Sequence, residues 1–531
     1  MKKEKQGTNI MRSSETSVVG RRISSVKLGL LRMTGKLSSW VAIAYIFRFV
    51  SSKLFFYAVI GIFSLQAAWF ATSFYYPMLF DEKFHFDLAQ AFTDKWLPFL
   101  TNESAGIDYY RDLANESGLL YHFLLSLPLR FIQLFTDSLM VQVVLLRYTN
   151  ILLVISGLFV FAHLLRKANI PQGAVNLGLL VFAGLPMTTY VAATINYDNA
   201  IFLLFPVFVW SCASVLAFKK GTRIKHLLIL ISVGCAASLM KYTFLPIFLA
   251  GVLLTAGILI KRHGFKNLLS GYKKEFNQKY NIASKITLWL LGIVATGLII
   301  VFCSVYVKNI IIYGSPSPKC EKTLSTQVCL KNEIFQRNYT SRQTVDERTP
   351  MPLADYVIFH WFKSMTLGFG YVAVNTEEGA KGPAPLAIIY SAIGFGFVVL
   401  LFIFAVGYRY IPRNDYMSAA LVLSICTIVA LLLYNTRSYY AYNEVFANQA
   451  RYLIYVLPLF LSLGVYLANV LLKEARIAKI MLLGVCFYIL SQGGGMLSYL
   501  VRSEPNWYLP NAKVRDVNTE LKDSISPLIS K

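Results

Sequence analysis

The chain has 531 residues, of which 56% are hydrophobic and 15% charged, and its formal net charge is +24. Its mean hydropathy is +0.54. A run of about 20 apolar residues crosses a bilayer, and such runs recur along the whole sequence. This composition excludes a soluble globular domain and predicts an all-α, polytopic membrane helical bundle. Basic excess in such a protein marks cytoplasmic loops, so no nucleic-acid partner is expected.

About eleven transmembrane helices are expected in chain order, with the fifth unusually short. They are 54–75, 139–164, 173–192, 200–218, 226–240, 243–260, 287–308, 386–407, 417–434, 452–472 and 479–500.

The charged residues are divided unequally between the two sets of connecting segments. One set holds 29 of the 51 Lys and Arg residues but only 5 of the 27 acidic residues. The other set is balanced. The positive-inside rule therefore places the first set in the cytoplasm. It consists of the N-terminal tail, 166–167, 219–225, 261–285, 409–415 and 473–479.

Three regions follow from this orientation. Residues 1–53 form a basic cytoplasmic tail whose charges attract anionic membrane lipids. Residues 54–500 form the transmembrane bundle, and 501–531 form a C-terminal tail outside the cell membrane. The expected location is the plasma membrane, with the N-terminus cytoplasmic.

Two outer loops, 76–138 and 309–385, are too long to be simple connectors, and structureless loops of this length are uncommon unless functional. Each contains an apolar stretch that predicts a juxtamembrane helix, at Leu119–Phe135 and around Ala354–Phe369. The second loop also holds Cys320 and Cys329, which we expect to form a disulfide because the loop lies outside the cytoplasm.

Asp81 and Glu82 directly follow the first expected span, and His85 comes three residues after Glu82. A partly desolvated carboxylate at the membrane surface can take a proton from an acceptor hydroxyl. The pair could equally cap the following helix, because acids favour the free N–H groups of a helix N-terminus. His85 could likewise be an interfacial or structural histidine.

Asn196 and Asp198 lie where two apolar segments meet at the outer side. A turn explains Asn and Asp at such a place. However, acids at membrane depth tend to be functional, and Asp198 could share a metal ion with Asp81 or position a substrate.

Lys241 and Arg451 lie at the outer ends of apolar spans, against the general charge bias. A lipid phosphate would explain them, since guanidinium grips phosphate oxygens with two hydrogen bonds. Snorkelling to the headgroup layer is the simpler alternative. Arg147 lies inside an expected span and should pair within the bundle.

Five segments in order resemble motifs of the GT-C superfamily of membrane glycosyltransferases, which includes protein O-mannosyltransferases and lipid A aminoarabinose transferase. The nearest likeness is to uncharacterised bacterial multi-pass families with an Asp-Glu-x-x-His-Phe motif. The usual prolines before the second segment are absent, and Ala450 stands where Gly is usual. The segments are Asp81-Glu-Lys-Phe-His-Phe, Leu119-Leu-Tyr-His-Phe-Leu-Leu, Asn196-Tyr-Asp-Asn, Lys241-Tyr-Thr and Gln449-Ala-Arg-Tyr-Leu.

The resemblance implies a GT-C-like bundle that transfers a sugar from a polyprenyl-phosphate donor at the outer membrane face. It implies Asp81 as catalytic base, with Glu82 orienting it or binding an ion. Asp198 would be a second polar group near the site, with His85 and Asn196 as further substrate-binding candidates. Lys241 and Arg451 would neutralise the leaving lipid phosphate. A divalent metal ion at Asp81 and Asp198 is left open.

Two alternatives come from other classes of protein. A transporter or lipid flippase would also have many spans, although transporters often show internal repeats with broken helices, and no convincing repeat is present. A non-catalytic assembly protein could use the large outer loops to dock a partner. Convergence of Asp81, Asp198 and Arg451 around one outer site would favour the enzyme.

Overall fold

The computed structural model describes residues 45–101, 112–278, 280–345, 349–370, 374–376, 379–381, 387–473, 484 and 496–529. The chain divides into two compact units between Phe56 and Tyr57. The first unit's described part contains the beginning of helix α3. All that follows concerns the second unit, which holds every candidate site residue.

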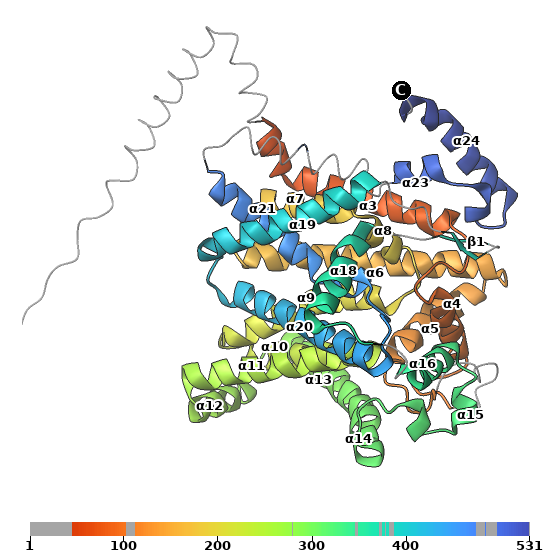
Figure 1. The fold of residues 1–531 in the computed structure, drawn as a ribbon. Coiled ribbons are helices and arrows are strands. Elements are labelled where there is room, and N and C mark those ends of the chain that lie inside the picture. The colour runs from red at the N-terminus through yellow and green to blue at the C-terminus, as the bar shows by residue number, and fades with distance from the viewer. Residues whose placement is uncertain are drawn as a thin grey trace, which may run out of the picture. The chain divides into compact units, whose positions relative to one another are not determined.

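Long apolar helices dominate the second unit (Figure 1). Within the described residues, eight helices are long and apolar enough to cross a membrane, and a bent pair raises the number to nine. The protein is therefore a polytopic helical membrane bundle, as expected. The eight are α3 (Lys53–Ser73), α6 (Leu139–Lys167), α9 (Tyr197–Leu216), α10 (Arg223–Met240), α11 (Leu245–His263) with the turn Tyr242–Phe244, α13 (Ile282–Phe302) continued by a π-helical turn and α14 (Lys308–Tyr313), α19 (Ala387–Gly407) with the turn Tyr408–Tyr410, and α20 (Asp415–Tyr442).

The span expected at 173–192 is broken. Helix α7 (Gln172–Gly184) and helix α8 (Pro186–Ala192) meet at an angle of 79°. Proline lacks a backbone N–H and disfavours a helical residue before it, and Leu185 accordingly has an extended backbone. The expectation of one continuous helix was wrong at this point.

The last two expected spans have different outcomes. Helix α21 (Leu457–Leu471) is shorter than the predicted span because residues Ala450–Leu453 form a separate 3-10 turn. It packs closely on α7, where a Cβ atom added at Gly178 would lie 2.5 Å from the Cα atom of Ser462. The span expected at 479–500 falls mostly outside the described residues.

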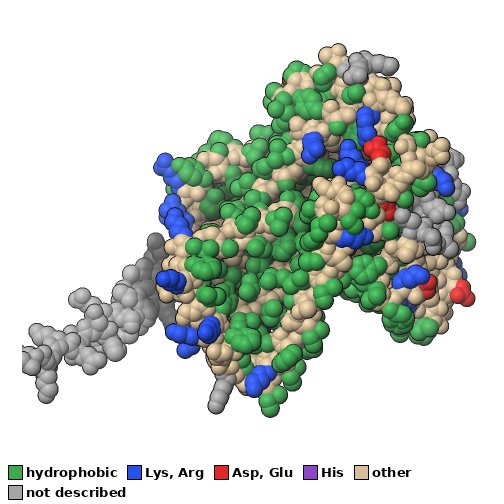
Figure 2. Space-filling view, turned by 90° about the horizontal axis from the view of Figure 1, so that it is seen from below, with side chains coloured by type: hydrophobic (Ala, Val, Ile, Leu, Met, Phe, Trp, Pro, Cys, Tyr) green, Lys and Arg blue, Asp and Glu red, His purple; other side chains and the backbone are tan. Residues whose placement is uncertain are grey.

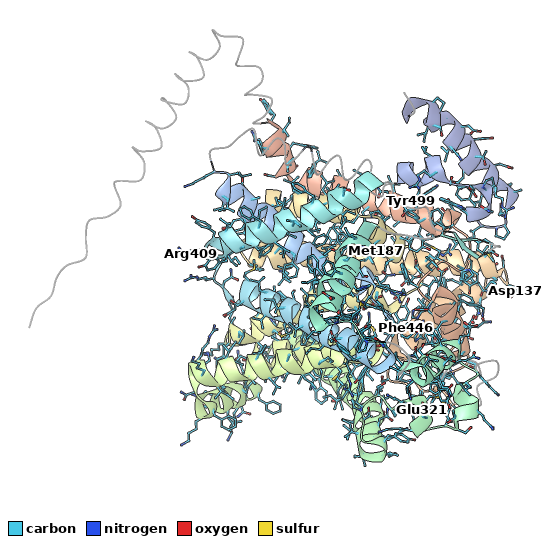
Figure 3. The ribbon with its side chains drawn as sticks, in the orientation of Figure 1. Asp137, Met187, Glu321, Arg409, Phe446 and Tyr499 are labelled. Atoms are coloured by element: carbon cyan, nitrogen blue, oxygen red, sulfur yellow. A yellow bond between two sulfur atoms is a disulfide. The ribbon has the colours of Figure 1, made fainter. Side chains whose placement is uncertain are left out.

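The two ends of the bundle carry different charges. The basic end is formed by segments 166–171, 217–225, 261–281 and 408–414, and Lys and Arg side chains line this edge in Figure 2. The other end, here called the site end, carries acidic and basic residues together. In Figure 3, Arg409 lies at the basic end, and Asp137 and Glu321 lie at the site end.

The site end is elaborated by short elements. Both expected juxtamembrane helices are present, at α5 and at residues 353–367, and Cys320 and Cys329 form the expected disulfide, with an S–S distance of 2.08 Å. The two short antiparallel strands β1 (Val374–Thr376) and β2 (Gly379–Lys381) were not expected. The remaining helices are α4 (Glu82–Ala91), α5 (Leu120–Gln133), α15 (Thr326–Cys329), α16 (Glu333–Gln343), α17 (Leu353–Asp355), α18 (Lys363–Leu367), α23 (Met496–Arg502), α24 (Ala512–Ile529) and, at the basic end, α12 (Phe265–Phe276).

Candidate active site

Asp81 lies in the short loop between α3 and α4. Phe80 and Asp81 both have positive φ angles, 71° and 67°. Non-glycine residues hold this conformation only where surrounding contacts impose it, and such residues concentrate at functional sites. The Asp81 side chain makes no capping hydrogen bond to α4. Asp81 thus occupies the N-cap position of α4, but its carboxylate is not used to cap the helix.

A buried ion pair between Glu82 and Arg147 fixes this loop. Arg147 donates two hydrogen bonds to the Glu82 carboxylate, at 2.8 and 2.7 Å. The same carboxylate accepts from the backbone N–H groups of Met78 and Ile195. Arg147 also donates to the carbonyls of Ala71, Phe74 and Tyr75.

These contacts use the whole hydrogen-bonding capacity of the Glu82 carboxylate. Four donors occupy its two oxygens, and the residue is completely buried. No oxygen remains free to exchange a proton or to bind an ion. Glu82 was among the residues expected to be catalytic, and in the structure its carboxylate holds the Asp81 loop through these contacts. The pairing expected for Arg147 within the bundle is confirmed.

Arg451 connects Asp81 to the bundle interior. Its Nη2 atom donates to the Asp81 carboxylate at 3.2 Å, and its Nη1 donates to the carbonyl of Phe80 at 3.1 Å. Arg451 itself is buried, whereas the Asp81 side chain is 51% exposed. Asp81 is therefore the acid that solvent and a substrate can reach.

Asp198 and Lys241 form a second ion pair beside the first. The Lys241 ammonium donates to Oδ1 of Asp198, and both residues are buried. The other oxygen, Oδ2, has no hydrogen-bond partner and lies 3.9 Å from the unpaired Nε of Arg451. Burial lowers the pKa of Lys241, and the charge of Asp198 partly offsets this effect. Asp81, Arg451, Asp198 and Lys241 thus converge in one cluster, here called the charged cluster.

Aromatic rings enclose the two cations of the charged cluster. The Lys241 nitrogen lies 4.5 Å from the centre of the Tyr452 ring and 5.0 Å from that of Tyr197. The Arg451 guanidinium lies 4.7 Å from the centre of the Phe80 ring. Aromatic faces attract cations and limit the water that reaches them. The snorkelling alternative is therefore wrong, because both cations point into the protein.

Asn196 supports the loop that carries Asp81. Its side-chain oxygen accepts from the backbone N–H of Asp198 and so caps the N-terminus of helix α9. Its side-chain nitrogen donates to the carbonyl of Phe80 at 2.8 Å. Asn196 thus links the segments that carry the two acids, and its bonds are made to backbone groups.

His85 is buried and forms a pair with His122. The Nδ1 atom of His85 lies 2.9 Å from Nε2 of His122, and the rings are stacked. Burial lowers the pKa of His85 well below its usual value and that of His122 to about 3. Both rings are therefore neutral at physiological pH. His85 was expected to bind substrate, but it lies in the interior, where the structural alternative fits better.

The donor set at the charged cluster does not fit a metal ion. Asp81 and Asp198 each face a cationic side chain, which a metal ion would have to displace. Among the residues that the structure describes, no group of three or more His, Cys, Asp or Glu side chains could hold a metal ion. These residues therefore do not support the metal ion left open at Asp81 and Asp198.

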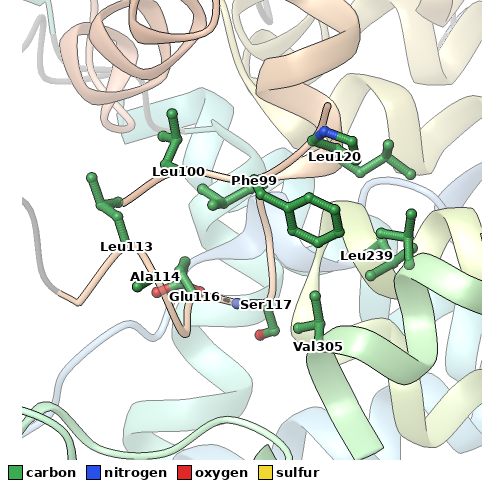
Figure 4. Close-up of a pocket in the computed structure, with 12 residues that line it drawn as sticks. Phe99, Leu100, Leu113, Ala114, Glu116, Ser117, Leu120, Leu239 and Val305 are labelled. Atoms are coloured by element: carbon green, nitrogen blue, oxygen red, sulfur yellow. Dashed lines mark hydrogen bonds between the residues drawn. The ribbon is translucent and has the colours of Figure 1, made fainter. Parts of the chain in front are cut away.

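A separate small pocket lies near α5 and the end of α10 (Figure 4). Most of its lining is apolar, as with Phe99, Leu113, Leu239 and Val305, and Glu116 and Ser117 add polar groups. It contains no residue of the charged cluster.

Sequence patterns did not identify three supporting residues. Asn150 accepts hydrogen bonds from Tyr121 and Asn199, His122 pairs with His85, and Tyr452 covers both cations. Two signals could have indicated them: Tyr452 directly follows Arg451, and Tyr452 and His122 both lie within segments that resemble GT-C motifs.

Comparison with known proteins gives little further information. No family model matches the sequence, and no curated protein matches it. Among solved structures, the chain is similar to the archaeal oligosaccharyltransferase AglB from Archaeoglobus fulgidus, in complex with an inhibitory peptide and a dolichol-phosphate. The identity is 13% and the TM-score 0.42, with 85% of this chain and 58% of that chain covered. The chain thus spans 58% of the length of that enzyme.

Proposed function

We propose that the protein is a membrane glycosyltransferase that moves a sugar from a polyprenyl-phosphate donor to an acceptor hydroxyl at the site end. The observation that carries this proposal is the charged cluster: a half-exposed acid, Asp81, adjoins two enclosed cations, Arg451 and Lys241. An acid for the acceptor beside cations for a phosphate is the arrangement that inverting sugar transfer needs. The GT-C motif resemblance adds support at the same residues.

In the proposed reaction, Asp81 accepts the proton of the acceptor hydroxyl. The hydroxyl oxygen forms a bond to C1 of the sugar while the bond from C1 to the phosphate oxygen breaks. The electron pair of the breaking bond stays on the lipid phosphate. Positive charges that are already fixed in position before the reaction stabilise this developing negative charge, because the protein does not have to rearrange during the reaction.

Arg451 and Lys241 are placed to supply that stabilisation. In the pair between Arg451 and Asp81, Arg451 is buried but the Asp81 carboxylate is half exposed, so solvent screens the pair and Asp81 can exchange it for another partner. A phosphate can take the Nη2 atom of Arg451 and release Asp81 for the acceptor. Lys241 stays tied to Asp198, so its charge is fixed in position. The proposal also places the site end at the outer face of a plasma membrane. The charge distribution favours this orientation.

One observation favours the transporter alternative, namely the break between α7 and α8. Broken helices line the substrate sites of many transporters. Here the residues at the break, Gly184 and Leu185, carry no polar side chain, and none of the four residues of the charged cluster belongs to α7 or α8. The non-catalytic assembly alternative does not explain why two cations are enclosed beside an exposed acid.

Lipid capture tests the donor half of the proposal. The protein is purified from membranes, and polyprenyl-phosphate lipids that copurify are quantified by mass spectrometry. The amount of lipid that copurifies with the variant Arg451→Gln should be at least about tenfold lower than with the wild-type protein. The reason is that loss of a charge-assisted phosphate contact costs at least about 1.4 kcal/mol. Arg262→Gln, which breaks an exposed ion pair with Asp415 at the basic end, is the matched control. Equal retention by all three proteins contradicts the proposal.

A further inference from the structure

The C-terminal segment lies against the loop that carries Asp81. Pro505–Trp507 forms a 3-10 turn that precedes α24, and Trp507, Tyr508 and Leu509 are buried. Figure 3 shows Tyr499 of α23 beside the end of α3. Its ring lies 5.0 Å from that of Phe70. We call residues 505–518 the C-terminal strap.

Two backbone hydrogen bonds join the strap to the end of α3. The N–H of Tyr75 donates to the carbonyl of Trp507, and the N–H of Leu509 donates to the carbonyl of Ser73, both at 2.8 Å. Together they make Phe74 and Tyr508 an isolated antiparallel bridge. Residues about 430 positions apart in the sequence are thus held in register.

A side-chain amide makes the second connection. Asn518 on α24 accepts a hydrogen bond from Nε1 of Trp69 at 2.7 Å and donates to Oγ of Ser73 at 3.2 Å. Asn518 is 3% exposed. Buried polar groups of this kind are costly when unpaired, so this junction favours a single arrangement of α24 against α3.

The strap and Arg147 both bind Tyr75. The strap binds the N–H of Tyr75, while Arg147 binds the carbonyls of Phe74 and Tyr75. Arg147 is in turn fixed by Glu82, the residue that follows Asp81. A continuous chain of hydrogen bonds therefore runs from Asn518 through Ser73–Tyr75 and Arg147 to the loop of Asp81.

We infer that the C-terminal strap is a positioning element of the active site and that Asn518 and Trp69 are positioning residues. The loop needs such support because Phe80 and Asp81 both hold positive φ angles, a strained conformation that persists only where surrounding contacts impose it. The inference rests on the proposed function for its catalytic consequence, but its structural part can be measured without activity.

The first measurement is amide hydrogen exchange in the full-length protein. Asn518→Leu and Trp69→Phe each remove one side of the junction. Exchange should become at least about tenfold faster at Tyr75 and Met78 in both variants, while α9 and α20 keep wild-type protection. Leu467→Ala is the control, because it opens a cavity beside Gly407 at the basic end and leaves the strap intact. Unchanged exchange at 73–82, or the same increase throughout the bundle, overturns the inference.

The second measurement is sugar transfer. Displacing a catalytic group by about 1 Å can cost about 100-fold in rate. Both variants should lower kcat by roughly tenfold or more with KM for the lipid donor unchanged, because Arg451 and Lys241 are not on the strap. The double variant should be no worse than either single one. A wild-type protein that transfers no sugar refutes the proposed function, whereas a normal kcat in Asn518→Leu refutes only the strap's role.

Discussion

Removing the guanidinium of Arg147 should strongly destabilise the protein, because Arg147 is the buried counter-charge of Glu82. Arg147→Met leaves a methionine of similar length and deletes five hydrogen bonds, two to Glu82 and three to backbone carbonyls. Glu82 then keeps two backbone N–H donors but loses its counter-charge in a fully buried position. Leaving one member of a buried ion pair alone costs about 3–5 kcal/mol.

The double variant Arg147→Met with Glu82→Met separates charge from packing. Because no lone charge remains, it should be less destabilised than Arg147→Met by about 1 kcal/mol or more. Both free energies of unfolding can be measured by denaturant titration of the purified protein in one detergent. A cost below about 1 kcal/mol for Arg147→Met, or strictly additive costs in the double variant, would refute the reasoning.

Three further predictions concern the histidine pair, the second ion pair and the disulfide. The pKa of His122 is about 3 in the fold against 6.5 when unperturbed, so its contribution to stability is full above pH 6.5 and is lost as the pH falls towards 3. At pH 5 the free energy of unfolding has fallen by about 2 kcal/mol for this reason. In His122→Gln the free energy of unfolding should therefore change less between pH 7 and pH 5 than in the wild-type protein. The same pH dependence in both proteins contradicts the lowered pKa of His122. Lys241→Met should destabilise the protein by about 3–5 kcal/mol, and the double variant Lys241→Met with Asp198→Leu should be destabilised by less. Denaturant titrations measure both free energies of unfolding. Equal costs would mean that the two residues are not coupled. Cys320→Ser with Cys329→Ser should lower stability by about 2–3 kcal/mol while leaving transfer intact, and loss of transfer would place the second outer loop in the site.

Sequence patterns predicted the bundle and all four residues of the charged cluster. Apolar length identifies a span wherever the helix is continuous, as in α6 and α20. It missed the break at Leu185 because the residues around it remain apolar and only Pro186 marks it. Asp81, Asp198, Lys241 and Arg451 were identified because a charge at the end of an apolar helix is expensive without a partner.

The roles of neighbouring residues could not be read in the same way. Glu82 and Asp81 are adjacent and chemically alike, yet one is fully buried against Arg147 and the other is half exposed. Only the tertiary packing of α6 against the first loop distinguishes them. No local pattern identifies the partners of His122 and Asn518, which lie 37 and 449 positions away.

Sugar transfer by Asp81 variants tests the proposed reaction most directly. Membranes that contain the wild-type protein, Asp81→Asn or Asp81→Glu are supplied with a labelled polyprenyl-phosphate sugar, and label on the acceptor is measured over time. Asp81→Asn should fold normally, because the side chain is half exposed, and should transfer at least about 100-fold more slowly, since it cannot accept a proton. Asp81→Glu should retain part of the activity. Transfer by Asp81→Asn at the wild-type rate would show that Asp81 is not the base.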